Sequence, residues 1–211
     1  MGKIVLGAAV CFLYPTFLVA QDIRPVPEDQ ARSIGAKLVE LADKIDKPQV
    51  KIESDASKAN GIHVPDKLGI LVIPQKDLKE SDELAAKFKA ERGAPLAYLF
   101  AYRVLPVIDG KRIDASRVRT LKVTDKEGTE RTAYVLLLSV RQTGEDDYRL
   151  YAYGTEDQPL VDAKFAPGDD AGTGPVVVEV KDPDEQTQEG NVVVTVFGKY
   201  RASFRAGYEG D

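Results

Sequence analysis

Apolar residues early in the chain recur every three or four positions, which is the spacing of one face of an α-helix. The stripe comprises Ala31, Ile34, Leu38, Leu41, Ala42 and Ile45. Pro27 suits the first turn of a helix, and Pro48 is placed to end it. We therefore predict a helix over residues 28–46.

A second helix is expected shortly afterwards. The compact apolar run 68–73 predicts a buried strand. Asp77 followed by Glu80 resembles a capping box, and Gly93 is placed to end a helix. The pattern between them predicts a helix over residues 78–92.

From Pro95 onward the apolar period changes to two, which is typical of strands. Residues 95–105 are apolar on both faces, so this strand should be covered on both sides. The dipeptide Asp109-Gly110 indicates a tight hairpin turn. Further strands are expected at residues 117–124, 130–141, 148–153, 160–165, 176–180, 192–197 and 200–208.

These elements predict an α+β fold. The N-terminal helices would pack on a predominantly antiparallel β-sandwich or open barrel of six to eight strands. We expect one domain over residues 21–211, with a helical part at about 28–92 and a β-rich part at about 95–208. Strand 68–73, helix 78–92 and strand 95–105 could instead form a parallel crossover unit, which would make the sheet mixed.

The first twenty residues have the layout of a secretory signal peptide. Lys3 is followed by a mainly apolar run from Ile4 to Ala20, and Ala20 is a small residue at which cleavage could occur. An uncleaved membrane anchor is the alternative, although Pro15 interrupts the run. We therefore predict a secreted or periplasmic protein with no transmembrane segment after removal of residues 1–20.

Charge and composition exclude several classes of function. The chain has 29 Lys and Arg residues against 34 Asp and Glu residues, and its net charge of -5 argues against a nucleic-acid partner. Removal of residues 1–20 takes away Lys3 and Cys11, which leaves 28 against 34, or -6, and no cysteine. The exported chain then has no thiol chemistry and must fold without disulfides.

Catalytic motifs are missing as well. His63 is the single histidine; we place it in a loop, where it is the only possible catalytic base of a Ser-His-Asp arrangement. The serines lack a G-x-S-x-G context, and no phosphate-binding loop is present. We therefore predict no catalytic residue, no structural zinc and no cofactor, and we favour a protein that is not an enzyme.

Acidic residues offer two other kinds of site. Asp169 and Asp170, beside the glycines at 168, 172 and 174, are weak candidates for calcium ligands. A facing pair of carboxylates could hydrolyse a carbohydrate. With no Trp, the sugar would have to stack on tyrosines, although a role in the core is the favoured interpretation of Tyr98, Tyr102, Tyr134, Tyr148, Tyr151 and Tyr153.

A local group of cations is the remaining candidate site. It comprises Lys111, Arg112, Arg117, Arg119 and Lys122. The group is interpreted mainly as the solvated end of a strand, and alternatively as a docking surface for an acidic polymer or partner.

The leading hypothesis is an exported, non-catalytic binding or structural protein of the cell envelope or extracellular space. Its partner would be an envelope protein or a polysaccharide. One alternative is a small carboxylate-dependent hydrolase acting on carbohydrate. The other is a calcium-stabilised module of the adhesion type.

Overall fold

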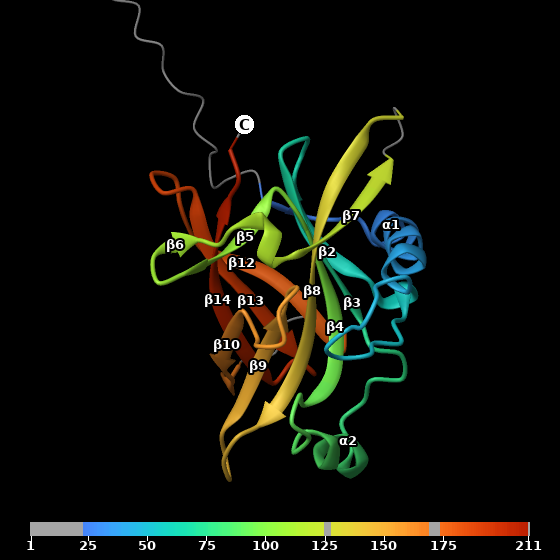
Figure 1. Cartoon of the computed structure of the whole chain (residues 1–211), viewed down its shortest axis with the longest axis vertical. Coiled ribbons are helices and arrows are strands. Elements are labelled where there is room, and N and C mark those ends of the chain that lie inside the picture. The colour runs from blue at the N-terminus through green and yellow to red at the C-terminus, as the bar shows by residue number, and fades with distance from the viewer. Residues whose placement is uncertain (1–22, 125–127, 169–173, 211) are drawn as a thin grey trace, which may run out of the picture.

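The computed structural model describes residues 23–124, 128–168 and 174–210. Strands account for 50% of the structure and helices for 14%, so the fold is β-rich with few helices. The strands of these described residues form two antiparallel sheets, and the sheets do not close into a barrel (Figure 1). The fourteen strands of the described residues exceed the six to eight expected, partly because three of them contain only two residues.

The larger sheet, called sheet 1, has the central order β1-β2-β3-β4-β8-β9-β10, and β7 also pairs with β8. Its strands are β1 (Arg24–Pro25), β2 (Asn60–Val64), β3 (Leu68–Pro74), β4 (Ala94–Tyr102), β7 (Arg119–Thr124), β8 (Glu130–Gln142), β9 (Tyr148–Tyr153) and β10 (Val161–Lys164). Residues 28–92, the expected helical part, thus supply two strands of the larger sheet.

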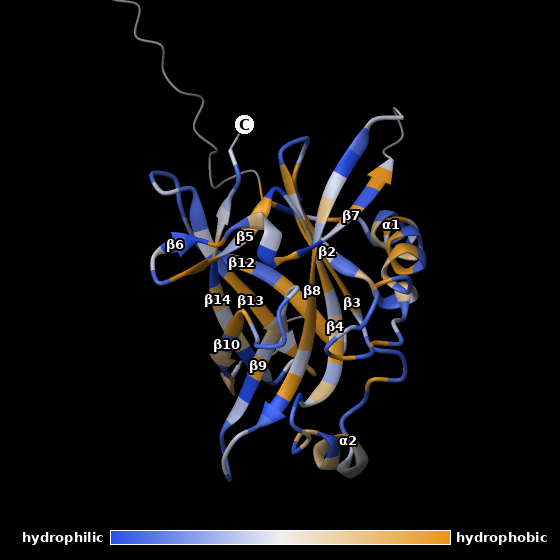
Figure 2. Ribbon diagram, in the orientation of Figure 1, coloured by the Kyte–Doolittle hydropathy of each residue, from blue (hydrophilic) through white to orange (hydrophobic). Residues whose placement is uncertain are grey.

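The smaller sheet, called sheet 2, has the order β12-β13-β14-β5-β6, and β11 pairs with β14. Its strands are β5 (Val104–Ile108), β6 (Lys111–Arg112), β11 (Ala166–Pro167), β12 (Val176–Asp184), β13 (Glu189–Val196) and β14 (Tyr200–Tyr208). Figure 2 shows that apolar residues follow the middle of the central strands, whereas polar residues mark their ends and turns.

Two apolar clusters follow from the alternation of side chains along the strands. Leu99 and Leu138 belong to the cluster that also contains Val192 and Val194 of sheet 2. Tyr98 and Leu137 belong to a different cluster on the other face of sheet 1. The prediction that strand 95–105 is covered on both sides is therefore confirmed for β4.

Helix α1 (Glu28–Ala42) begins at the predicted residue and ends earlier than predicted. Its buried residues Ala31 and Leu38 share the second cluster with Tyr98 and Leu137. Beyond α1, Val50 and Ile52 are buried although they lie in no helix or strand.

The second helix is much shorter than predicted. Helix α2 (Asp82–Lys87) has six residues, and its cap is Ser81, whose hydroxyl accepts a hydrogen bond from the backbone N–H of Leu84. The expected capping residue Asp77 has a positive φ of 56°, outside the extended region that an N-cap residue normally adopts. Figure 1 shows α2 at the end of the molecule, below the sheets.

The alternative of a parallel crossover unit is wrong. Strands β3 and β4 pair side by side in antiparallel register, with Gly69 opposite Tyr102 and Pro74 opposite Ala97. The segment that contains α2 leaves β3 and enters β4 at the same end of the sheet. A parallel pair would need the connection to return to the opposite end.

The strand predicted over residues 95–105 is two strands in two different sheets. Arg103, between β4 and β5, has a φ of 57°, and this left-handed residue redirects the chain from sheet 1 to sheet 2. The next turn matches its prediction. Asp109 and Gly110 both have positive φ and join β5 to β6, as a two-residue hairpin of this composition requires.

The loop predicted around His63 is in fact strand β2. His63 lies opposite Arg24 of β1 and Gly69 of β3. Gly61 made this segment resemble a loop in the sequence, because glycine is rare inside strands. Its role is a close approach: a Cβ at Gly61 would lie 2.2 Å from the carbonyl oxygen of Ile70.

The two sheets are joined along one side by a side-chain amide. Asn60 of β2 donates to the carbonyl oxygen of Val176 at 2.7 Å and accepts from the N–H of Val178 at 3.2 Å. The amide therefore takes the place of a neighbouring strand for the edge of β12. On the other side the chain passes from β10 in sheet 1 to β11 in sheet 2 within two residues.

The predicted signal peptide, residues 1–20, lies outside the described residues. None of the helices that the structure describes has the length and hydrophobicity needed to cross a bilayer.

Candidate functional site

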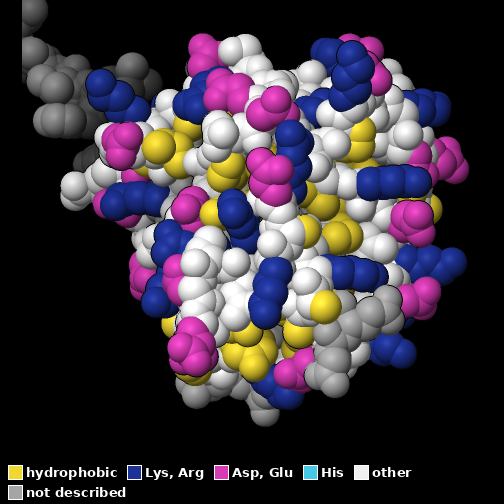
Figure 3. All heavy atoms as spheres, turned by 60° about the horizontal axis from the view of Figure 1, so that its bottom comes forward, with side chains coloured by type: hydrophobic (Ala, Val, Ile, Leu, Met, Phe, Trp, Pro, Cys, Tyr) yellow, Lys and Arg dark blue, Asp and Glu magenta, His cyan; other side chains and the backbone are white. Residues whose placement is uncertain are grey.

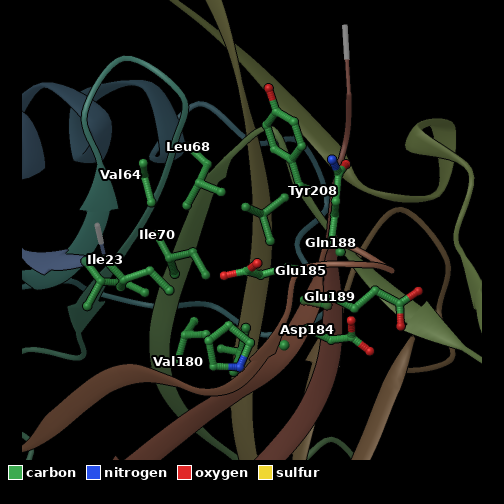
Figure 4. A pocket seen from close by; sticks show the side chains of 17 residues that line it. Ile23, Val64, Leu68, Ile70, Val180, Asp184, Glu185, Gln188, Glu189 and Tyr208 are labelled. Carbon is green, nitrogen blue, oxygen red and sulfur yellow. The ribbon is translucent and has the colours of Figure 1, made fainter. Parts of the chain in front are cut away.

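A cleft of about 90 Å³ lies between the two sheets. Its floor is aliphatic and comes from both sheets: Ile62, Val64, Leu68, Ile70, Val104, Val180, Val192 and Ala206. Ile23, just before β1, also lines it, as the close view in Figure 4 shows. The cleft is thus an opening into the apolar layer between the sheets.

A distortion of the edge strand β12 forms one wall of the cleft. Lys181 lies opposite Asn191 and Asp184 opposite Glu189, so β12 uses three steps where β13 uses two, and one residue is extra. Asp182 has a positive φ of 48° in this bulge, and such bulges bend a strand. Pro183 lacks an N–H, which is tolerated because β12 is an edge strand.

Three carboxylates line the rim beside this bulge. The carboxylate of Asp184 accepts hydrogen bonds from the backbone N–H groups of Thr187 and Gln186, and these bonds lower the pKa of Asp184. Glu189 pairs with Arg205 at 2.6 Å. In Figure 4 the carboxylate of Glu185 points into the cleft, toward Ile70, while those of Asp184 and Glu189 point away from it.

The end of β14 completes the rim. Tyr208 donates its backbone N–H to Gln188, and the guanidinium of Arg103 lies 5.0 Å from the centre of the Tyr208 ring. The next residue, Glu209, donates its backbone N–H to Arg103 and accepts a hydrogen bond from the buried hydroxyl of Tyr134. These contacts hold the end of the described chain against the mouth of the cleft.

The volume of the cleft and the carboxylate of Asp184 limit the chemistry of this site. A cavity of about 90 Å³ is smaller than the roughly 150 Å³ that accommodates benzene in an engineered cavity, so it suits a short alkyl chain or a compact side chain. A glycosidase needs one carboxyl group with a raised pKa as general acid, whereas the pKa of Asp184 is lowered.

The five cations of the predicted patch are divided between two places. Lys111 and Arg112 lie on β6, and Arg119 and Lys122 lie on β7, on the opposite side of the molecule in Figure 1. Arg117 ends the short 3-10 helix η3 (Ala115–Arg117) that leads into β7.

All but Lys111 have intramolecular partners among the described residues. Arg112 donates to the carbonyl oxygen of Tyr208, and Lys122 pairs with Glu130 at 3.1 Å. Arg117 pairs with Glu156 at 3.1 Å, and this carboxylate raises the pKa of Arg117. A docking role for these cations stays a prediction.

Arg119 connects two parts of the fold through hydrogen bonds. Its guanidinium donates to the carbonyl oxygens of Asp46 and Lys47 and to the side chain of Gln49 at 3.0 Å. Gln49, which is buried, donates in turn to the carbonyl oxygens of Thr155 and Glu156. These bonds tie the segment after α1 to β7 and to the loop after β9.

The tyrosines considered for sugar stacking lie mostly in the cores. Tyr98, Tyr134, Tyr151 and Tyr153 are buried, which agrees with the favoured interpretation. Burial raises the pKa of Tyr98 and Tyr153, and burial together with Glu209 raises that of Tyr134 to about 12. These four rings do not offer a face to a sugar.

The weak calcium candidates Asp169 and Asp170 lie outside the described residues. Within residues 23–124, 128–168 and 174–210, no group of three His, Cys, Asp or Glu side chains is placed to hold a metal ion. Figure 3 shows the end of the molecule that lies at the bottom of Figure 1, where Lys and Arg are interspersed with Asp and Glu and with small apolar patches.

Sequence reasoning missed the cleft itself. Asp184 and Glu185 were visible only as part of an acidic turn, and the aliphatic floor was visible only as core. The one local signal is Pro183 inside a strand, because proline there indicates an edge or a bulge. What joins β2, β3, β12 and β14 around one cavity is their long-range packing.

No protein-family model matches the chain, and comparison with curated proteins and with solved structures finds no match.

Proposed function

We propose that this chain is an exported, non-catalytic binding protein, and that its cleft between the sheets holds a small apolar group of the ligand. The ligand would be a molecule of the cell envelope or extracellular space, or a side chain of an envelope protein. Export is supported by the sequence pattern of residues 1–20. We further propose that the two sheets form a sandwich with α1 packed on its outer face.

The observation that carries the proposal is the aliphatic floor of the cleft. Burying apolar surface contributes about 25 cal/mol per Å², so a group that fills the cleft gains affinity without needing new polar partners. The supporting rim is polar, with Gln188, Tyr208 and the carboxylates, as is usual for small-molecule sites.

A matched pair of variants tests the role of the cleft. Val180 lines the cleft and Val177 does not, although both lie on β12 and are half-buried. We expect 1-hexanol to shift backbone amide signals of cleft residues in NMR spectra of the full chain, with a dissociation constant of about millimolar for so small a ligand. Val180→Trp should abolish these shifts by filling the cleft, and Val177→Trp should retain them. Equal shifts in both variants would refute a ligand site here.

Export has its own test. When the full chain is expressed in a host with a secretion pathway, we expect an exported product that begins at Gln21. Mass spectrometry of the purified chain checks the new N-terminus. A chain that keeps residues 1–20 and remains with the membrane fraction would instead support the anchor.

One observation favours a second candidate, the carbohydrate hydrolase. Asp184, Glu185 and Glu189 do line one cleft, as a carboxylate-dependent enzyme requires. Assay of the full chain against aryl glycosides tests it, with Glu185→Gln as the variant that should remove any turnover. Turnover that disappears in this variant would replace the binding proposal.

A further inference from the structure

A second, smaller cavity adjoins the cleft on its inner side, and the inference drawn from it rests on the proposed function. This inner cavity has a volume of about 10 Å³. Four residues line both spaces: Ile70, Val104, Val192 and Ala206. We propose that the site takes the end of an unbranched alkyl chain, which enters through the cleft and places its terminal methyl group in the inner cavity.

The two cavities follow one direction across the strands. On sheet 1, β2 lines only the cleft, β3 lines both spaces, and β4 and β8 line only the inner cavity, through residues such as Leu99 and Leu136. On sheet 2, the edge strand β12 lines the cleft but not the inner cavity. Both sheets therefore step from the side where Asn60 joins β2 to β12 toward the middle of the protein. Neighbouring strands lie about 4.8 Å apart, so a thin chain can follow this line whereas a compact branched group fills only the cleft.

The inner cavity has room for one small group and offers it no polar side chain. A space of about 10–15 Å³ is roughly what one water molecule needs, and a water also needs polar partners. The side chains of the described residues that line the inner cavity are all apolar, so a methyl group suits it better than a water does. Besides the four shared residues, the lining comprises Leu99, Ala101, Leu105, Pro106, Leu136 and Phe204.

A series of alcohols separates an unbranched chain from apolar volume alone. The full chain is titrated with 1-butanol, 1-hexanol, 1-octanol and the branched 3,3-dimethyl-1-butanol, and its methyl signals are followed by NMR. We expect the affinity to rise about four-fold for each methylene of the unbranched alcohols. The branched alcohol has as many carbon atoms as 1-hexanol but a chain two carbons shorter, so it should bind about ten-fold more weakly than 1-hexanol. Equal affinities of these two isomers would overturn the inference.

Nuclear Overhauser effects locate the end of the bound chain. In the complex with 1-octanol, the terminal methyl group of the alcohol should contact the methyl groups of Leu99 and Leu136, which line only the inner cavity. The protons beside the hydroxyl group should instead contact Val64 and Val180 of the cleft. A terminal methyl group that contacts only residues of the cleft would show that the chain folds up there, and the inference would be wrong.

Leu136→Ala enlarges the inner cavity, and Leu138→Ala is its matched control. Both leucines are buried on β8 in the same apolar cluster, but Leu138 lines neither cavity. Leu136→Ala should raise the affinity for 1-octanol about four-fold relative to that for 1-butanol, since a further methylene gains a place inside. Leu138→Ala should leave this ratio unchanged. The same change in both variants, or a change in neither, would contradict the inference.

Ala101→Val tests the same point without removing a large side chain. Ala101 lines only the inner cavity, and its matched control, Ala97, lies on the same strand in the same cluster and lines neither space. Ala101→Val should lower the affinity for 1-octanol about four-fold and leave that for 1-butanol unchanged, because the added methyl groups occupy the place of the chain end. Ala97→Val should change neither affinity. If Ala101→Val binds 1-octanol as tightly as the unmodified chain does, the inner cavity takes no part in binding.

The two proposals fail in different ways. If 1-hexanol and its branched isomer bind equally and Val180→Trp abolishes both, the apolar site stands and the selection of an unbranched chain is overturned. If no alcohol shifts any signal of a residue that lines the cleft, both proposals are overturned.

Discussion

The outer faces of the two sheets differ in what surrounds their buried apolar side chains. On sheet 1, Tyr98, Phe100, Val135 and Leu137 form a continuous apolar surface that shares one cluster with residues of α1. On sheet 2, the buried Val193 has Glu179 and Ser203 as its cross-strand neighbours. One face thus shares an apolar cluster with α1, and on the other a buried valine has polar cross-strand neighbours.

The ion pairs of sheet 2 explain how polar residues can screen a valine. Lys181 pairs with Glu179 at 3.3 Å, and Arg205 pairs with Glu189 at 2.6 Å. Long charged side chains cover apolar surface with their aliphatic stems while their charged ends stay in water. The charged side chains of sheet 2 can therefore cover part of its outer face.

The largest expected effect compares the same residue type on the two faces. Val135→Ala removes two methyl groups at a fully buried site of sheet 1 and should lower the free energy of unfolding by about 2–3 kcal/mol. Val193→Ala on sheet 2 should cost about 1 kcal/mol, because flexible charged neighbours can fill the space. Urea denaturation of both variants measures the difference, and equal losses would contradict the contrast between the faces.

A second effect tests the contact that joins the sheets. Asn60→Ala removes both hydrogen bonds to β12 and leaves the carbonyl oxygen of Val176 and the N–H of Val178 without them. The expected loss is about 2–3 kcal/mol, since unsatisfied backbone groups are costly. Asn191→Ala is the control, because its amide contacts only the exposed Asp182, and it should cost about 0.5 kcal/mol or less. Similar midpoints in urea for the two variants would refute a bridging role.

A third effect concerns the layer between the sheets and depends on pH. Tyr134→Phe removes the hydrogen bond to Glu209 and should cost about 1–2 kcal/mol at neutral pH. The pKa of Tyr134 is raised to about 12 from its usual 10, so the contribution is complete below pH 10 and is lost as pH rises through 12. Chemical denaturation at pH 7 to 11.5 should show the two curves converging above pH 10. If the difference in stability between the two proteins stayed constant with pH, ionisation of the Tyr134 hydroxyl would not weaken its contact with Glu209.

The smallest effect is expected for an ion pair of sheet 2. Arg205→Ala breaks the pair with Glu189, in which the side chain of Arg205 is half exposed. The loss should stay below about 1 kcal/mol and shrink as salt is added. Thermal melting at 0.05 and 0.5 M salt measures it, and a loss that salt does not change would indicate packing by the arginine stem instead.

Local sequence patterns predicted the strands in which apolar and polar residues alternate regularly, and they predicted one tight turn. The strand predicted at 148–153 matches β9, and the strands at 130–141 and 200–208 match β8 and β14 within a residue. The dipeptide Asp109-Gly110 predicts a hairpin, and the structure gives both residues the positive φ that such a turn requires. Such features depend on neighbours in the chain.

The errors arose where a distant contact overrides the local pattern. The connection after β3 forms only a six-residue helix, and β4 returns beside β3 in antiparallel register, which the local pattern did not reveal. Arg103 looks like an ordinary strand residue, yet its left-handed conformation transfers the chain between sheets. Gly61 looks like a loop residue, yet β3 requires its small size.

By itself the sequence determined the β-rich character, the start of α1 and the double apolar faces of the central strand, because alternation and helical spacing are local properties. The sequence also shows the export pattern and the lack of catalytic motifs on which the proposed function depends. Only the tertiary structure decided which strands are neighbours, and therefore that Glu185 points over a floor built from β2, β3, β12 and β14. The physical reason is that a cleft between two sheets is made by residues more than a hundred positions apart, and no window along the chain contains them together.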